Sequence, residues 1–214
     1  MIKQFMKNKI IKVRDTINKD TLKEVKYILE NDGLIVYPTD TLYALGANAL
    51  SKEAINKVFK AKGRNFNKPI SIALKNLEEA KKYFIFNEIA EKIAKKFLPG
   101  PLTIILPSYV LPKELSPTHK FSFRIPENDI ALKILENIDF PLTATSANIS
   151  GGENPINAKI AKKQIGKYVD LILDCGKCKY GKPSTVVDLS NGKIVLVREG
   201  VISLECLYSA LSLV

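Results

Sequence analysis

The chain is poor in the residues that anchor metal, redox and membrane functions. Among its 214 residues there is no tryptophan, one histidine and three cysteines. It has no run of about 18 uncharged apolar residues, so no membrane span is predicted. Its first ten residues carry several lysines and lack the apolar core of a secretory signal. Because cysteines without a pairing pattern are typical of a reducing compartment, we expect a cytoplasmic protein.

The few histidine and cysteine side chains argue against metal and triad chemistry. Cys175 and Cys178 form a lone Cys-x-x-Cys, and a tetrahedral zinc site would need two further ligands. His119 lies in a proline-rich loop with no carboxylate spaced to orient it, so a Ser–His–Asp arrangement has little support. We therefore predict no protein-bound metal.

Two common phosphate-binding loops are also absent. Gly176 to Lys182 fits G-x-x-x-x-G-K, but Pro183 follows where a P-loop needs Ser or Thr and then a helix. There is no G-x-G-x-x-G. If the chain binds a nucleotide, it uses another architecture.

Positive charge is abundant, with a formal net charge of +11 and 46% hydrophobic residues. One interpretation is an anionic partner such as a nucleotide or RNA. The other is a lysine-rich composition, in which cations spread over every helix form no binding face. Charge alone leaves both open.

Hydrophobic periodicity predicts a single α/β domain over residues 1–214 with a mixed sheet. Asp20 is the expected N-cap of the first helix and Gly33 its end, and Asn191-Gly192 is expected to form a type I′ turn between the last two strands. The expected helices are 20–30, 51–62, 77–84, 88–97, 130–138, 157–165 and 204–213, and the expected strands are 10–13, 34–37, 70–74, 102–106, 121–125, 171–174, 184–189 and 194–197.

A polar stretch from Thr143 to Gly152 follows an apolar run and contains five short hydroxyl or amide side chains. It could be a loop that caps the next helix, or a cradle for a phosphate. Arg124 and Arg198 favour the cradle, because both lie among apolar strand residues and a buried guanidinium needs an anion.

Seven ordered motifs, within about residues 20–203, resemble the YrdC/Sua5 family, the threonylcarbamoyl-AMP synthases. They are Pro38–Gly46, Lys62–Arg64, Pro99–Thr103, Arg124–Pro126, Thr145–Gly151, Ser184–Asp188 and Arg198–Gly200. The resemblance implies a single YrdC-like domain, in which helices flank a twisted mixed sheet around a large basic cavity.

The resemblance also implies a nucleotidyltransferase reaction. L-Threonine, bicarbonate or CO₂ and ATP would give threonylcarbamoyl-AMP and pyrophosphate, for the N6-threonylcarbamoyladenosine at position 37 of tRNA. Mg²⁺ would enter with ATP as substrate, and no tightly bound cofactor is expected. The implied partners are the downstream tRNA threonylcarbamoyltransferase machinery and tRNA itself.

Carried over motif by motif, the resemblance assigns site residues. The catalytic signature falls on Lys62, Arg64, Ser146 and Asn148. The implied ATP contacts are Lys62, Arg64, Lys68, Lys120, Ser146, Asn154 and Arg198, and the implied threonine contacts are Thr41, Arg124, Ala144 and Ser184. Two departures stand out: Ala44 replaces a usual glycine, and Ala73 stands where longer members have a threonine-contacting histidine.

Two other functions stay open at this level. The charge and an expected concave basic surface would suit a non-catalytic module that binds double-stranded RNA or tRNA. A different carbamoyl transferase is the third hypothesis, although such relatives carry acylphosphatase-like and zinc-finger domains that have no counterpart in these 214 residues.

Overall fold

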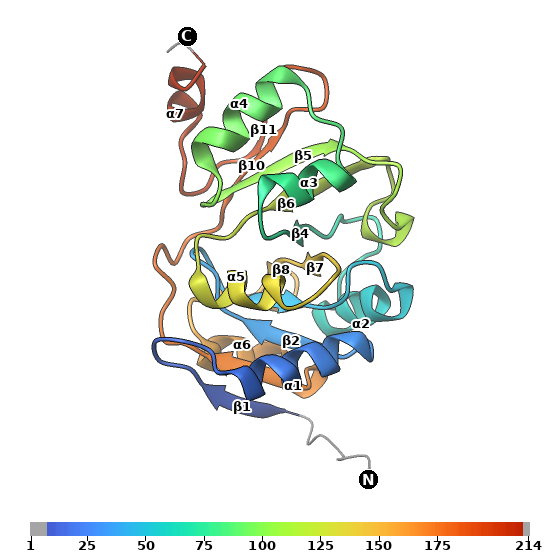
Figure 1. The fold of residues 1–214 in the computed structure, drawn as a ribbon, viewed down its shortest axis with the longest axis vertical. Coiled ribbons are helices and arrows are strands. Elements are labelled where there is room, and N and C mark those ends of the chain that lie inside the picture. The colour runs from blue at the N-terminus through green and yellow to red at the C-terminus, as the bar shows by residue number, and fades with distance from the viewer. Residues whose placement is uncertain (1–7, 212–214) are drawn as a thin grey trace.

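The computed structural model describes residues 8–211 of the protein. Within these residues, eleven strands form two mixed sheets, and seven α-helices surround them (Figure 1). Among the described residues, no helix is long and apolar enough to cross a membrane. The mixed α/β class is thus confirmed, although the strands divide between two sheets where the sequence predicted one.

The five-stranded sheet has the order β1-β9-β2-β3-β8 and lies in the lower half of Figure 1. Strands β1, β9 and β2 run parallel, whereas β3 pairs antiparallel with both β2 and β8. Its strands are β1 (Lys9–Lys12), β9 (Leu171–Asp174), β2 (Ile35–Tyr37), β3 (Ala44–Gly46) and β8 (Thr145–Ser146).

The six-stranded sheet has the order β11-β10-β5-β6-β4-β7 and lies above it. The pairs β10/β5 and β6/β4 are parallel, and the other three pairs are antiparallel. Its strands are β11 (Val195–Arg198), β10 (Thr185–Asp188), β5 (Leu102–Pro107), β6 (Lys120–Arg124), β4 (Ile72–Ala73) and β7 (Leu142–Thr143).

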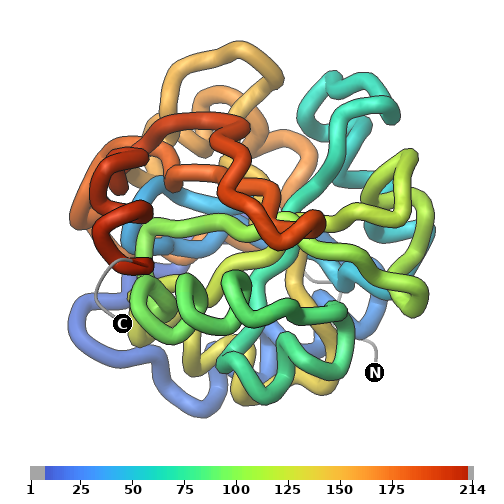
Figure 2. The backbone as a smooth tube through the Cα atoms, turned by 90° about the horizontal axis from the view of Figure 1, so that it is seen from above, coloured from blue at the N-terminus to red at the C-terminus, as the bar shows by residue number. Residues whose placement is uncertain are grey.

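The helices cover the outer faces of the sheets. Viewed from above, α3 and α4 lie together on one side of the six-stranded sheet (Figure 2). Helices α1 and α6 lie against the five-stranded sheet, and α1 also contacts α5. The helices are α1 (Lys19–Glu30), α2 (Lys52–Lys62), α3 (Leu77–Tyr83), α4 (Glu88–Phe97), α5 (Asp129–Glu136), α6 (Ala158–Ile165) and α7 (Leu204–Ser209), with 3₁₀ turns η1 (Lys113–Leu115) and η2 (Gly166–Tyr168).

Local sequence explains where the helices begin. Each of the seven α-helices follows an Asn or Ser whose side chain accepts a hydrogen bond from a main-chain N–H in the first turn. Asn18 caps α1 in this way, so the predicted cap at Asp20 was wrong; Asp20 instead lies in the first turn, where its negative charge suits the helix dipole. Helix α1 ends at Glu30, as the predicted range 20–30 has it, but its C-cap is Asn31 and not Gly33.

Most other predicted elements are present with shifted ends. The β10–β11 hairpin is confirmed, but Asp188 pairs with Val195, so its connection is longer than the predicted two-residue turn. Asn191 also lacks the positive φ that a type I′ turn needs. Helix α7 ends at Ser209, and part of the predicted helix lies outside the described residues. Strands β3, β7 and β8 were not predicted.

Candidate active site

The polar stretch joins the two sheets. Its first strand, β7, pairs with β4 in the six-stranded sheet, and β8 pairs with β3 in the five-stranded sheet. Ala144 lies between them, and its main-chain N–H donates to the Ser71 carbonyl at 2.7 Å. The chain therefore crosses from one sheet to the other at the stretch that the sequence singled out.

This stretch does not cap the following helix. The N-cap of α6 is Asn157, whose side chain accepts from the Ile160 N–H at 2.9 Å. The capping alternative for this stretch is therefore wrong, whereas the helix predicted at 157–165 is confirmed as α6 (Ala158–Ile165).

A cavity of about 300 Å³ opens where the two sheets meet. Both sheets contribute to its wall: Ala44 and Thr145 come from the five-stranded sheet, and Thr103 and Ser122 from the six-stranded sheet. Eight of the twelve predicted site residues line it. They are Thr41, Arg64, Arg124, Ala144, Ser146, Asn154, Ser184 and Arg198.

Arginine is concentrated at this cavity. The chain has only four arginines, Arg14, Arg64, Arg124 and Arg198, and three of them line the cavity. Since the other 29 cationic side chains are lysines, an even scatter of surface charge does not explain this placement. Arginine suits planar, multidentate recognition of carboxylates and phosphates better than lysine does.

Arg124 is held by the loop after β2. Its guanidinium donates to Asp40 Oδ1 at 2.5 Å, to Thr41 Oγ1 at 2.6 Å and to the Gly100 carbonyl at 3.2 Å. Both charged side chains are buried. Burial raises the pKa of the Asp40 carboxyl, and the charge of Arg124 opposes that rise. The pair fixes Arg124 in one orientation at the cavity wall.

The other two arginines have no acidic partner within the described chain. Arg64 donates to the Pro69 carbonyl at 2.8 Å, and Arg198 donates to the Ser184 carbonyl at 2.9 and 3.2 Å. Burial lowers the pKa of both guanidinium groups. The charge of Arg198 lowers that of Arg64 further, and the charge of Arg124 lowers that of Arg198. Such uncompensated positive charge favours an anionic ligand.

Lys62 lies behind the polar stretch and does not line the cavity. It is only 1% exposed, and its ammonium donates to the Ser146 carbonyl, to the Asn148 carbonyl at 2.9 Å and to Asn148 Oδ1 at 3.3 Å. Burial, with the nearby charge of Arg64, lowers the pKa of Lys62 to about 7. In this structure the Lys62 ammonium is therefore not exposed to the cavity, where the implied contact with ATP would be made. It supports the loop at Ser146 and Asn148 through these hydrogen bonds.

Asn148 also stabilises the loop between Ser146 and Gly152. It is buried outside the cavity lining, accepts the Ser146 hydroxyl at 2.6 Å and donates to the Gly152 carbonyl at 2.9 Å. Lys68 and Lys120 lie outside the lining as well. Lys68 is exposed, and Lys120 forms an ion pair with Asp188 at 3.0 Å.

Sequence reasoning missed several hydroxyls of the wall. Ser71 and Ser122 face each other with their oxygens 2.7 Å apart, and Thr103 shares a hydrogen bond of 2.8 Å with Ser184. The alternation of side chains along β6 was an available signal, because it places Ser122 on the same face as Arg124. Of the two departures, Ala44 lines the cavity, whereas Ala73 is fully buried outside the lining.

No residue of the rejected motifs lines the cavity. No group of three or more His, Cys, Asp or Glu within residues 8–211 could hold a metal ion. Burial raises the pKa of the Cys175 thiol to about 12 and that of Cys178 to about 11, which disfavours the reactive thiolate. Gly176–Lys182 leads into strand β10 and not into a helix, so it is no P-loop.

Known proteins share this sequence and fold. The profile of the Sua5_yciO_yrdC family, described as "Telomere recombination", matches residues 27–200. A Methanocaldococcus jannaschii protein, named as a candidate threonylcarbamoyl-AMP synthase, is 43% identical over 94% of this chain and 97% of its own length. A Pyrococcus abyssi threonylcarbamoyl-AMP synthase is 38% identical over 92% of this chain, which spans only 58% of that relative.

Solved structures of relatives have the same fold as this chain. The crystal structure of P. abyssi Sua5 complexed with L-threonine matches with a TM-score of 0.91 and 35% identity, over 94% of this chain and 60% of that one. The structure of Escherichia coli YciO matches with a TM-score of 0.85 and 28% identity, over 94% of this chain and all of that one. The same architecture therefore occurs both in a threonine-binding relative and in YciO.

Proposed function

The chain belongs to the Sua5/YrdC family, and from that premise we propose that it is an L-threonylcarbamoyladenylate synthase. As such it is an enzyme of the nucleotidyltransferase class. It forms threonylcarbamoyl-AMP and pyrophosphate from L-threonine, bicarbonate or CO₂ and ATP. Support comes from the named relatives and from the P. abyssi neighbour that holds L-threonine.

One observation carries the proposal: three of four arginines line one hydroxyl-rich cavity, and two of them lack a counter-charge in the described chain. The substrates are a carboxylate and a triphosphate, and both are anions. Arg64 and Arg198 suit the triphosphate, because their positive charge has no internal partner. Arg124 suits the threonine carboxylate, which carries a single negative charge, because Asp40 already balances part of the positive charge of Arg124.

The contacts of Arg124 narrow how threonine is held. Three of its five N–H donors are used by Asp40, Thr41 and Gly100, and its Nε is buried without a partner. One NH1 donor stays available, so we propose a single hydrogen bond to the carboxylate, supported by the Thr41 and Ser184 hydroxyls. Because the Ala144 N–H is bonded to Ser71, Ala144 would contribute its carbonyl.

The proposed chemistry needs no protein nucleophile. The threonine amine and CO₂ form a carbamate, whose oxygen attacks the α-phosphorus; the bond between that phosphorus and the bridging oxygen breaks, and pyrophosphate leaves. The protein positions the two anions and stabilises charge on the leaving group. Enclosure between the sheets would also protect the carbamate from water.

Mg²⁺ fits as a companion of ATP. The absence of any cluster of metal-ligating side chains within residues 8–211 suits an ion held mainly by phosphate oxygens and water, which is the usual mode for Mg²⁺ with nucleotides. Bound there, it would reduce the charge on the triphosphate. No tightly bound cofactor is proposed. The product would pass to tRNA threonylcarbamoyltransferase machinery, which modifies adenosine 37.

The test is release of pyrophosphate from ATP with threonine and bicarbonate, measured with each substrate omitted in turn. We expect release to require all three. Release that continues without threonine would overturn the assigned reaction. The non-catalytic RNA-binding module remains the alternative, and it predicts tRNA binding without any pyrophosphate release.

A further inference from the structure

A pair of serine hydroxyls in the cavity wall has one hydrogen-bond donor to spare. Ser71 Oγ and Ser122 Oγ lie 2.7 Å apart and share one hydrogen bond, and both residues line the cavity. Among the described residues, neither hydroxyl has a further hydrogen-bond partner. Ser122 is only 7% exposed, and a buried donor without a partner is costly. Since each hydroxyl donates one hydrogen bond, the pair keeps one donor for a ligand.

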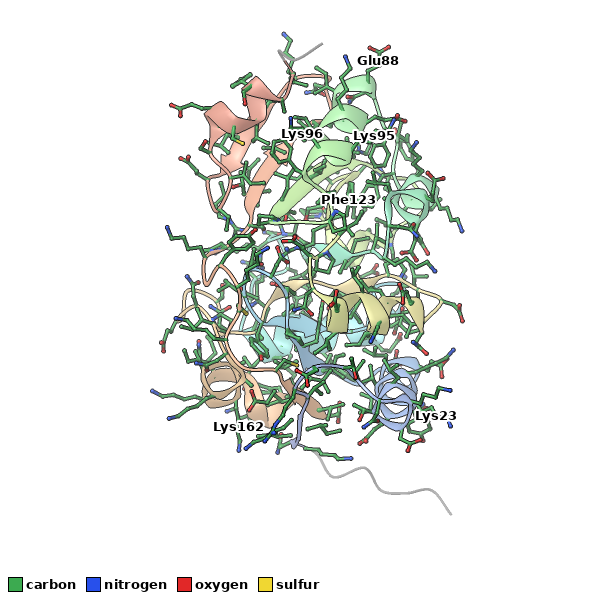
Figure 3. The ribbon with its side chains drawn as sticks, turned by 60° about the vertical axis from the view of Figure 1, so that its left-hand side comes forward. Lys23, Glu88, Lys95, Lys96, Phe123 and Lys162 are labelled. Atoms are coloured by element: carbon green, nitrogen blue, oxygen red, sulfur yellow. The ribbon has the colours of Figure 1, made fainter. Side chains whose placement is uncertain are left out.

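The pairing of β4 with β6 holds the two serines together. The strands run parallel, and each serine directly precedes the first pair of residues in register. Phe123, the next residue after Ser122, packs its ring against two phenylalanine rings from the segment between α3 and α4, with ring centres 4.5 and 5.7 Å apart. Figure 3 shows Phe123 below α4. Because side chains alternate along a strand, Ser122 and Arg124 face the opposite way, toward the cavity.

The serine pair lies between the two arginines that we assign to different substrates. In the direction of the strands, Ser122 comes two residues before Arg124, which is a separation of about 7 Å. On the other side, Ser71 comes two residues after Pro69, whose carbonyl accepts a hydrogen bond from Arg64 at 2.8 Å. The order along the wall is therefore the arginine for the triphosphate, the serine pair, and the arginine for the threonine carboxylate.

The groups of the proposed product follow the same order. From the threonine carboxylate, the covalent chain runs through the α-carbon and the nitrogen to the carbamoyl group and then to the α-phosphorus. When the carboxylate is at Arg124 and the phosphates are at Arg64, the carbamoyl group comes to lie beside the serine pair. The free hydroxyl can donate to one carbamate oxygen while the other oxygen attacks the phosphorus.

An uncharged donor suits this position. A guanidinium in the same place would bind both carbamate oxygens and would hold back the one that has to attack. The other hydroxyl pair of the cavity is already occupied by a cation, because Arg198 donates to Ser184 Oγ at 3.3 Å while that hydroxyl pairs with Thr103. The serine pair has no such contact among the described residues.

We propose that Ser71 and Ser122 bind the carboxylate group of N-carboxythreonine, the carbamate, and position it for attack on ATP. The inference rests on the proposed function, whose intermediate it places. In the first step, the threonine nitrogen forms a bond to the carbon of CO₂, one oxygen gains the negative charge, and a proton leaves the nitrogen for the solvent. The serine pair donates a hydrogen bond to the carbamate and transfers no proton.

The experiment measures pyrophosphate release by the full chain with one substrate varied at a time. The variants are Ser71→Ala, Ser122→Ala and the double variant. We expect Ser122→Ala to lower kcat/KM for bicarbonate by about 10- to 100-fold, the usual worth of a hydrogen bond to a charged group, and to change KM for ATP by less than about twofold. The double variant should lose about as much as the worse single variant, because the two hydroxyls act as one unit.

Ser116→Ala is the matched control. Ser116 is 2% exposed, and its hydroxyl also lies near another hydroxyl, that of Thr118 at 3.3 Å, outside the cavity lining. Its kcat/KM for bicarbonate should stay within about twofold of the wild type. An equal loss in Ser116→Ala and Ser122→Ala, or no loss in the variants of the serine pair, would overturn the proposal.

Binding of L-threonine without ATP distinguishes a carbamate contact from a contact to threonine itself. Calorimetry measures this binding in bicarbonate and in sodium chloride of the same ionic strength. Bicarbonate should tighten binding to the wild type and should not do so in Ser122→Ala, whereas the two proteins should agree within about twofold in chloride. A loss of affinity in chloride would show that Ser122 contacts threonine or supports the fold, and would overturn the inference.

The two measurements also separate this inference from the proposed function. If bicarbonate tightens threonine binding through the serine pair but the wild type releases no pyrophosphate, the proposed reaction fails and the carbamate site stands. If the wild type requires all three substrates and Ser122→Ala behaves like the wild type in both measurements, the reaction stands and the carbamate site fails.

Discussion

The guanidinium of Arg124 lies 2.5 Å from the Asp40 carboxylate, and the two side chains are 5% and 0% exposed. Neither residue could stay charged in this position without the other, because an isolated buried charge is strongly disfavoured. Asp40 does not line the cavity. It acts through Arg124, which it orients and partly neutralises.

Asp40→Asn tests this positioning role. The amide keeps the shape of the carboxylate but removes its charge, so Arg124 would be held less firmly and would bear more uncompensated charge. We expect KM for threonine to rise about tenfold or more, KM for ATP to change little, and the thermal midpoint to fall. Steady-state kinetics and thermal unfolding check this. In the control Glu91→Gln, which breaks exposed pairs with Lys81 and Lys95, neither KM should change. Equal rises in both KM values would contradict a role confined to Arg124.

The lowered pKa of Lys62 predicts that ATP binding is coupled to the uptake of a proton. Its pKa is lowered to about 7 in the free protein, so at about pH 8 it is largely neutral. A triphosphate bound over Ser146 would favour the ammonium form and raise that pKa, so ATP binding should take up a proton. Calorimetry in two buffers of different ionisation enthalpy measures this uptake. We expect it in Lys60→Met and not in Lys62→Met. Equal heats in both buffers for the wild type would contradict the assignment.

Arg64 should contribute through its charge and its planar geometry. Arg64→Ala is expected to lower kcat/KM by about 10²–10³, by analogy with other transition-state charge stabilisers. Arg64→Lys should recover only part of this loss, because lysine lacks the paired donors. The matched control is Arg14→Ala, since Arg14 is exposed and is the one arginine outside the cavity lining. Similar losses of kcat/KM in Arg14→Ala and Arg64→Ala would contradict a specific role of Arg64 in the cavity.

Gly200 has a structural role beside Ser184. A Cβ added at Gly200 would lie 2.3 Å from the Pro183 carbonyl oxygen and 2.5 Å from the Ser184 carbonyl carbon. Gly200→Ala should therefore force this segment away from Ser184 and destabilise the protein by about 1–3 kcal/mol. Denaturant unfolding measures the change, and activity should fall with it. Gly166→Ala is the comparison, because its φ is −52° and the nearest atom to its added Cβ is the flexible Lys162 side chain at 3.1 Å. An equal or larger effect there would contradict the packing argument.

The long periodic elements were the predictable part of the fold. Helix α2 has a capping Ser51, an apolar face and Gly63 in the left-handed conformation at its end, and each feature is local in the sequence. Strands β3, β7 and β8 have two or three residues each, which is too short for a period to show. Their pairing depends on partners far along the chain. The division into two sheets was hidden for the same reason.

The candidate site was predictable in its residue types more than in its geometry. The motifs identified Arg64, Arg124 and Ser146, and all three line the cavity. The sequence could not show that Lys62 is buried behind the loop and outside the cavity lining. A lysine two residues before an arginine is equally suited to direct contact with a phosphate. Nor could the sequence show the pairing of Ser71 with Ser122, whose strands meet only in the folded sheet.

The central claim is that the protein forms threonylcarbamoyl-AMP in this cavity, from threonine, the carbon of bicarbonate and the AMP part of ATP. Mass spectrometry of the product formed from ATP, threonine and ¹³C-bicarbonate tests it most directly. The account predicts threonylcarbamoyl-AMP that carries one ¹³C atom, in amounts matching the pyrophosphate released. A threonyl-adenylate without the label, or ADP and phosphate in place of AMP chemistry, would contradict it.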